Sequence, residues 1–419
     1  MKQQTEGTPR NRFSKRHWLV IAAGFVMFYF YNASTSDGMN VIVPRLAQER
    51  GWDYAYTLSF ATLAGCVSVF GQLLFGLLCR KLGPRKTISI ALALAAGFFA
   101  LYGFAWSIPV YVVALCGVVS CSSAYSYVGV SSLIANWFPE KKGIASGYSS
   151  MGTPASTATS VAALTFLFGR VGFTPVMAAV AAVLLALAVL SFLLLRDTPE
   201  ECGELPDGGA SDGNTVPGAA GAAAGGEISV RDMLKIREMW LTGVISGLYS
   251  IVTIGVMGQF VIRHAETGIS ESGVLLMLTV CAVMGIVGSP ILGRLENRLG
   301  TKRAFQLCCL LYLAAMLLNF TNVRILVYLS VICIGVVITG TPIFLMSFLV
   351  SIFGRKNFKT AYAIAYPVSS LIGQTAFLLT AASLRLFGTM RQAYLLFALM
   401  LAAILVLTLF LRMDRWKHA

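Results

Sequence analysis

Ionisable side chains are nearly absent from the apolar stretches of this chain, and the exceptions indicate where chemistry could occur. Asp37 is the only Asp, Glu, Lys, Arg or His inside these stretches, and it lies at the end of the first one. Arg263 and His264 directly follow the seventh stretch. A carboxyl group inside an apolar stretch is costly to bury, so it is a candidate for a functional residue. We expect Asp37 to pair with Arg263 or His264 as a gate; alternatively, all three are solvated residues at the edge of the apolar region.

Polar side chains also recur at helical spacing. Tyr29, Asn32 and Ser36 follow one another at steps of three and four, which places them on one face of a helix. Such stripes either join helices through hydrogen bonds or line a water-accessible binding site. The candidate binding residues predicted from these stripes and from the polar cluster of the fourth stretch are Tyr29, Asn32, Ser36, Tyr125, Tyr249, Thr253, Tyr362, Tyr366 and Gln374.

The composition requires a membrane as the solvent. The 419 residues are 57% hydrophobic and 12% charged, whereas soluble domains carry about 25% charged residues. The chain contains twelve apolar runs of the length needed to cross a bilayer. They show no period-2 alternation, so they are expected to be helices. The runs are 18–37, 55–78, 87–106, 109–135, 144–168, 173–195, 240–262, 272–292, 304–320, 325–350, 360–384 and 392–411.

The basic residues predict how these helices are oriented. With the N-terminus inside, 25 of the 32 Lys and Arg residues fall in inside segments. The positive-inside rule therefore predicts a multi-pass protein of the inner (cytoplasmic) membrane with both ends in the cytoplasm. It also accounts for the net charge of +14 without a nucleic-acid partner, which would need a basic patch on a soluble face.

One polar segment occurs once in each half of the chain. Gly76–Lys86 is repeated as Gly293–Arg303, 217 residues later. Each copy has a glycine, three further residues, a polar pair, Leu-Gly, one more residue, and a second basic pair. A basic turn that recurs once per half indicates a duplicated membrane bundle. The motif residues are Gly76, Arg80, Lys81, Gly83 and Arg85 in the first copy, and Gly293, Asn297, Arg298, Gly300 and Lys302 in the second.

This segment resembles the signature between helices two and three of the major facilitator superfamily, and its second copy, between spans eight and nine, also fits that family. The acidic residue usual after Gly-x-x-x is Arg80 here, whereas Asn297 is closer to the family pattern. The segments 136–147 and 353–359 resemble the oxalate:formate antiporter and monocarboxylate transporter branch. The resemblance implies an all-α membrane protein with twelve transmembrane helices in two pseudo-symmetric six-helix bundles. Helices one, four, seven and ten, with faces of two, five, eight and eleven, would line its central cavity.

The expected domains follow from the spans and from a shift in composition. Residues 1–15 form a cytoplasmic tail, 16–196 the first six-helix bundle, 239–412 the second, and 413–419 a second tail. The segment 197–238 is expected to be a cytoplasmic linker, because 197–226 is rich in Gly and Ala and poor in large apolar residues.

The function predicted is a secondary active or facilitative transporter that moves a small organic solute by alternating access. The best guess for the solute is a monocarboxylate-type organic anion, with a proton or a counter-solute as a possible partner. In the oxalate branch, basic residues in helices eight and eleven hold the dianion, and the corresponding spans here have none. An exporter of neutral or cationic amphiphiles and a non-transporting membrane sensor stay open as alternatives.

The same residues give no sign of an enzyme. No GxxxxGK[ST] loop is present, and the three histidines are not in metal-ligand spacing. The nine cysteines contain no CxxC pair and are interpreted as small apolar residues. We therefore expect no cofactor, no metal and no nucleic acid, and a monomer with the lipid bilayer as its surroundings.

Overall fold

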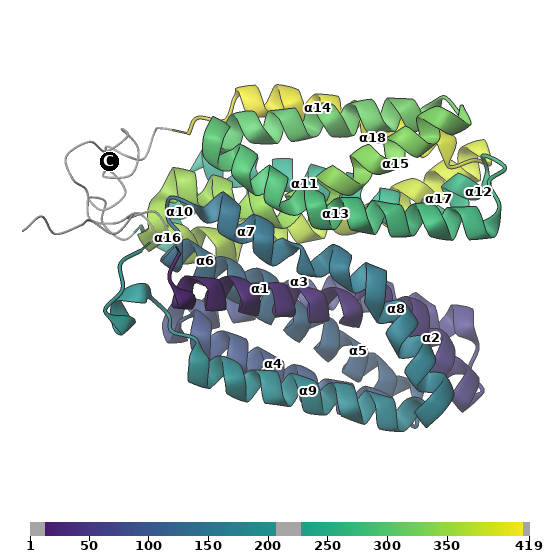
Figure 1. Cartoon of the computed structure of the whole chain (residues 1–419), viewed down its shortest axis with the longest axis horizontal. Coiled ribbons are helices and arrows are strands. Elements are labelled where there is room, and N and C mark those ends of the chain that lie inside the picture. The colour runs from purple at the N-terminus through teal and green to yellow at the C-terminus, as the bar shows by residue number, and fades with distance from the viewer. Residues whose placement is uncertain (1–12, 207–227, 414–419) are drawn as a thin grey trace, which may run out of the picture.

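The computed structural model describes residues 13–206 and 228–413. In these ranges the chain forms helices and no strand, and the long helices lie side by side in two groups, one from each half of the sequence (Figure 1). We call the end of the molecule that carries the two glycine motifs and α10 the basic face, at the left in Figure 1. The end that carries α2, α12 and α17 is the opposite face.

The first half contains six membrane spans built from ten helical segments. They are α1 (Lys15–Ser34), α2 (Ser36–Arg50), α3 (Tyr54–Leu82), α4 (Pro84–Gly103), α5 (Ile108–Ser123), the π-helical η1 (Ala124–Val130), α6 (Ser131–Trp137), α7 (Lys142–Ser150), α8 (Gly152–Val171) and α9 (Phe173–Leu194).

The second half is preceded by η2 (Pro199–Cys202) and α10 (Val230–Met233), which lie in the expected linker; residues 207–227 of that linker lie outside the described ranges. Its helices are α11 (Arg237–Gly258), α12 (Phe260–Ala265), α13 (Glu271–Leu299), α14 (Thr301–Phe320), α15 (Arg324–Ile338), α16 (Gly340–Gln374), α17 (Ala376–Phe387) and α18 (Arg391–Leu409).

The helices of the described residues account for the twelve predicted spans, although only ten stretches meet a simple test of length and apolar composition. Ten stretches are long and apolar enough to cross a membrane, and one of them runs over 51 residues, 324–374. A helix of that length would measure about 76 Å, more than twice the ~30 Å of a hydrocarbon core. It is two spans, because Gly354 leaves the helical conformation with φ 72°. The twelfth span is the pair α7 and α8, which packs against α1 and α13.

The helix breaks follow the two-fold repeat of the sequence. Spans two, three, six, eight, nine and twelve are continuous helices, whereas one, four, five, seven, ten and eleven are interrupted. The interrupted spans form equivalent pairs, one with seven, four with ten and five with eleven. Broken helices expose backbone groups that ligands can use, so these six spans are where a site is expected. The interruptions fall at Thr35, at 124–130, and at Met151, Gln259, Thr339 and Thr375.

The two glycine motifs adopt the same backbone. Gly83 ends α3 with φ 84° and ψ 164°, and Gly300 ends α13 with φ 80° and ψ 156°. A positive φ is unstrained only for glycine, which explains why the repeat keeps glycine at this position. The basic residue two positions later also has an equivalent role in both halves. Arg85 Nε donates to Phe192 O at 2.8 Å, and Lys302 Nζ donates to Leu411 O at 3.0 Å, so each turn is tied to the end of the sixth helix of its bundle.

Candidate functional site

Asp37 occupies a buried pocket of neutral hydrogen-bond donors. The first span breaks at Thr35, and α2 begins at Ser36, so Asp37 lies in the first turn of a new half-helix. Its side chain is 7% exposed. Asn32 Nδ2 donates to Asp37 Oδ2 at 2.6 Å. The partial positive charge of the helix N-terminus also favours a carboxylate at this position.

The other donors to Asp37 come from α8. Ser156 Oγ donates to Asp37 Oδ2 at 2.9 Å, and Ser160 Oγ does so at 3.4 Å. Thr157 Oγ1 reaches the other oxygen, Oδ1, at 3.3 Å. No ion pair joins Asp37 to a cation within the described ranges. A buried carboxyl group is thus held by four neutral side chains, and no basic residue balances its charge.

Arg263 and His264 form a separate network in the second half, and the structure does not bring them to Asp37. Arg263 is fully buried; its Nε donates to Asn319 Oδ1 at 2.9 Å, and its Nη1 lies 3.6 Å from Glu266 Oε2. His264 Nδ1 contacts Phe260 O at 2.7 Å, and its Nε2 lies 3.2 Å from Asn319 Nδ2. In this arrangement the guanidinium stabilises the end of α12 against α14, and the predicted gate pair is not formed.

Four tyrosines from both halves meet between the bundles. Tyr362 and Tyr366 of α16 stack with ring centroids 5.3 Å apart, and Tyr366 also stacks on Tyr127 of η1 at 5.1 Å. Tyr31 of α1 packs edge-on against Tyr127 at 5.0 Å. Ser131 Oγ donates to Tyr362 Oη at 3.3 Å and joins the two halves. We call Tyr31, Tyr127, Tyr362 and Tyr366 the tyrosine cluster.

The remaining predicted binding residues of the first half lie outside this cluster. Tyr29 Oη is 2.9 Å from Thr159 Oγ1, so Tyr29, like Asn32, faces α8. Ser36 is exposed at the start of α2. Tyr125 is fully buried, and its Oη donates to Ser122 Oγ at 3.4 Å within the same bundle.

The predicted binding residues of the second half fall into two groups. Some pack inside the second bundle, and one lies at the contact surface between the two halves, which we call the seam. Tyr249 Oη donates to Val337 O at 2.6 Å, and Thr253 Oγ1 donates to Tyr249 O at 3.2 Å, so this stripe packs inside the second bundle. The side chain of Gln374 lies against Gly65 of α3, which places it at the seam.

Sequence reasoning selected Asn32 but not the three partners of Asp37 on α8, and it selected only half of the tyrosine cluster, Tyr362 and Tyr366. Ser156 and Ser160 stand one helical turn apart in a Ser/Thr-rich run of the fifth span, and that spacing is a signal that could have found them. Tyr31 and Tyr127 lie in interrupted spans. Their role depends on how the two halves dock, which no local pattern reports.

Hydrogen bonds between α7 and α13 close the basic face. Asn297 Oδ1 accepts from Ile144 N at 3.2 Å, and Asn297 Nδ2 donates to Glu140 O at 3.1 Å. Lys142 Nζ donates to Ser351 Oγ at 2.6 Å and lies 3.9 Å from Glu296 Oε1. The second glycine motif therefore holds the start of the fifth span across the seam.

The equivalent seam between α3 and α16 has a different set of contacts. Gln72 Nε2 donates to Ser370 Oγ at 3.3 Å, and this bond lies nearest the opposite face among the hydrogen bonds that join the halves of the described chain. At the basic face, Arg355 makes a bidentate ion pair with Glu200 of η2, with Nη1–Oε1 at 2.7 Å and Nη2–Oε2 at 3.0 Å. Hydrogen bonds from Arg355 lower the pKa of Glu200 from 4.5 to about 2.

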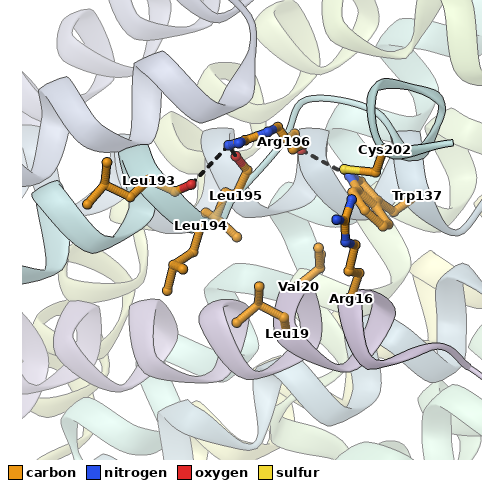
Figure 2. Close-up of a pocket in the computed structure, with 9 residues that line it drawn as sticks. All are labelled: Arg16, Leu19, Val20, Trp137, Leu193, Leu194, Leu195, Arg196 and Cys202. Atoms are coloured by element: carbon orange, nitrogen blue, oxygen red, sulfur yellow. Dashed lines mark hydrogen bonds between the residues drawn. The ribbon is translucent and has the colours of Figure 1, made fainter. Parts of the chain in front are cut away.

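A pocket of about 270 Å³ at the basic face shows how the loop after the fourth span is anchored (Figure 2). Trp137 Nε1 donates to Arg196 O at 3.0 Å, and Arg196 Nη1 donates to Leu195 O at 2.8 Å. Both arginines that line the pocket are already engaged, because Arg16 lies 4.0 Å from Glu204. This pocket therefore belongs to the packing of the first bundle. Within the described ranges, no three His, Cys, Asp or Glu side chains gather in a way that could hold a metal ion.

Several solved structures of membrane transporters share this fold. The human organic anion transporter MFSD10 (TETRAN) matches with a TM-score of 0.72 and 13% identity over 96% of this chain and 100% of that chain. The transporter FucP in its outward conformation matches with a TM-score of 0.72 and 15% identity over 95% and 100%. The proton:xylose symporter XylE matches with a TM-score of 0.68 and 13% identity over 95% of both chains. At these identities the likeness concerns the fold.

Comparison by sequence identifies the family. No curated protein matches the chain. The family model described as "Major Facilitator Superfamily" matches residues 19–318, which is more than half of the chain. With its two bundles of helices, its duplicated glycine motif and this match, the chain belongs to the Major Facilitator Superfamily.

Proposed function

We propose that this protein is a secondary transporter that moves a small organic solute together with protons, and that Asp37 is the proton-binding group. The observation that supports the proposal is the buried carboxyl group with four neutral donors and no cation among the described residues. A buried carboxylate is costly without a counter-charge, and a proton supplies one. The half-helix N-terminus at Asp37 resembles the broken helices that hold ions in other transporters.

The tyrosine cluster is proposed as the place where the solute binds. It lies at the seam of the two halves, in interrupted spans one, four and eleven. For a monocarboxylate, which is our first candidate, hydroxyl groups and helix N-termini would receive the anion. The organic anion transporter among the structural neighbours is consistent with this class.

A neutral solute is the second candidate, and the stacked rings favour it. No Lys, Arg or His contacts the four tyrosines among the hydrogen bonds and ion pairs of the described residues. Aromatic faces bind apolar and sugar-like rings without a charge partner. The proton:xylose symporter among the structural neighbours is consistent with a neutral, sugar-like solute.

The orientation and the domains are part of the proposal. With the basic face in the cytoplasm, both ends of the chain lie on that side, as the positive-inside rule requires. The bundles 16–196 and 239–412 would then rock about the seam, and 197–238 would link them on the cytoplasmic side. Among the described residues, the hydrogen bonds between the halves lie at the basic face and near the middle of the membrane; with the proposed orientation, this supports a conformation closed toward the cytoplasm.

Transport in proteoliposomes tests the proposal. A panel of labelled monocarboxylates, sugars and cationic amphiphiles is first screened by counterflow, which needs no proton gradient. We expect Asp37→Asn to retain counterflow of the accepted solute and to lose its accumulation under an imposed proton gradient. Glu49→Gln, a carboxyl group on the surface of α2, is the matched control and should accumulate solute normally.

Two results would contradict the proposal. Accumulation by Asp37→Asn at the wild-type level would show that protons bind elsewhere or not at all. A wild-type protein that binds a solute but shows no counterflow would be a sensor, which is the alternative outside transport.

A further inference from the structure

An apolar groove of about 400 Å³ runs along the seam between α3 and α16. Leu73 and Leu77 line it from α3, and Val368 and Leu371 line it from α16. Leu234 and Trp240, around the start of α11, form its wall at the basic face. These are membrane-spanning helices, so the groove faces lipid and not water.

The groove has the length of one leaflet. It extends along α3 from Val69 to Arg80, 11 residues apart, which is about 16 Å of helix. Half of a hydrocarbon core of ~30 Å is about 15 Å. The groove therefore begins near the middle of the membrane and ends at the basic face, as an acyl chain of that leaflet does.

The walls and the base of the groove are suited to a hydrocarbon chain. At its base Gly76 and Ala363 approach so closely that a Cβ at Gly76 would lie 2.8 Å from that of Ala363. Leu77 and Leu371 are 51% and 55% exposed and form the rims. Trp240 Nε1 already donates to Leu234 O at 2.8 Å, so the indole presents its apolar ring.

An arginine without a partner among the described residues marks the end of the groove at the basic face. Arg80 lines the groove and is exposed, and it makes no hydrogen bond or ion pair with any described residue. Lys359 stands one turn before Ala363 on α16 and adds a second positive charge to this end. The equivalent residue of the second motif, Asn297, is fully used in contacts across the seam.

From this juxtaposition we infer that the groove binds an anionic phospholipid, with its phosphate on Arg80 and one acyl chain between α3 and α16. Basic pockets between transmembrane helices at the cytoplasmic side are suited to anionic head groups. The apolar groove contributes affinity for any lipid of this leaflet, and Arg80 contributes the selectivity for negative charge. Because the lipid would contact both halves, it would stabilise the arrangement that is closed at the basic face.

Native mass spectrometry of the full chain tests this inference. The protein in detergent is titrated with phosphatidylglycerol and, separately, with phosphatidylcholine of the same acyl chains. Because one basic residue near a charged membrane surface contributes about 1 kcal/mol, we expect the tightest site to prefer phosphatidylglycerol about fivefold. Arg80→Gln should remove most of this preference and weaken phosphatidylcholine binding less, whereas Arg303→Gln, an exposed arginine outside the groove, should keep the preference.

A second variant locates the acyl chain. Leu77→Trp narrows the groove from its exposed rim and should weaken binding of both lipids at this site. Quenching by phosphatidylglycerol with brominated chains gives an independent readout, because Trp240 lies in the wall; the quenched fraction should fall in Trp240→Phe. Equal preference for phosphatidylglycerol in Arg80→Gln and Arg303→Gln would overturn the assignment of the phosphate to Arg80. Unchanged lipid binding in Leu77→Trp, together with an unchanged quenched fraction in Trp240→Phe, would overturn the assignment of the chain to the groove.

Discussion

The two copies of the glycine motif share a backbone but join the halves of the protein in different ways. Gly83 and Gly300 have nearly the same positive φ, and the basic residue two positions later binds the end of the sixth helix in both bundles. The copies differ where they meet the other half. Asn297 of the second copy makes two hydrogen bonds across the seam, and Arg80 of the first makes none with the described residues.

This difference shows that a duplicated element can keep its local role and lose its long-range one. The turn depends on glycine geometry and on contacts within one bundle, which both copies retain. The contact across the seam depends on the residue at one position, which is Asn in one copy and Arg in the other. On the first side, the linker residue Glu200 supplies an ion pair to Arg355 at the start of span eleven, and Arg80 is left for the lipid.

The largest expected effect comes from the glycines at the helix crossings. A Cβ at Gly293 would lie 2.1 Å from Gly143 O, which is backbone, whereas a Cβ at Gly76 would meet only the side chain of Ala363 closer than 3.0 Å. Overpacking of this kind costs roughly 1–3 kcal/mol. We expect Gly293→Ala to lower the transport rate roughly tenfold or more, and Gly76→Ala to lower it less, because backbone atoms cannot move aside as a side chain can.

The control for this pair is a compensating change. Gly76→Ala combined with Ala363→Gly moves the methyl group across the seam and should recover most of the lost rate. The accessibility of a cysteine placed at Ser131, which contacts Tyr362 across the seam, reports opening at the basic face. If Gly76→Ala opened the basic face more than Gly293→Ala does, the contact of Gly76 with a side chain would not be the more tolerant of the two.

The parts of the molecule that the sequence predicts are those governed by local rules. The repeat of Gly83 and Gly300 predicts two equivalent turns, because only glycine takes that conformation without strain. The helical spacing of Tyr249 and Thr253 predicts that the two side chains share a face of the helix, and they do. That face packs inside the second bundle, where Tyr249 contacts Val337 and residues of α14. Periodicity reports which residues point the same way, and the neighbour that they meet depends on docking of the helices. Asp37 was identified for the same reason that its partners on α8 were not: a lone charge stands out in an apolar stretch, whereas serines in a helix do not.

The intermediate effect is expected at Asn297. Asn297→Ala removes both hydrogen bonds to the start of the fifth span, including the one to Ile144 N. Loss of a cap on a helix N-terminus costs typically ~1 kcal/mol. The ratio of closed to open molecules at the basic face should therefore fall about fivefold, measured by labelling of the cysteine at position 131. Asn297→Asp, which keeps the acceptor for Ile144 N, should retain part of the closure and serves as the matched variant.

The smallest expected effect comes from the ion pair of Glu200 with Arg355. The side chains are 49% and 26% exposed, and pairs of this kind contribute about 0–1 kcal/mol. The pKa of Glu200 is lowered to about 2, so its contribution to the closed arrangement is complete above pH 4.5 and is lost as the pH falls from 4.5 toward 2. Glu200→Gln should therefore open the basic face slightly at pH 7, and the difference from wild type should shrink as the pH falls below 4.5. High salt should reduce the same difference, since exposed charges are screened. If the difference between Glu200→Gln and wild type grew on acidification, Glu200 would act through its neutral form. The seam between α3 and α16 would then have no ion pair in place of the hydrogen bonds that Asn297 makes between α13 and the start of the fifth span.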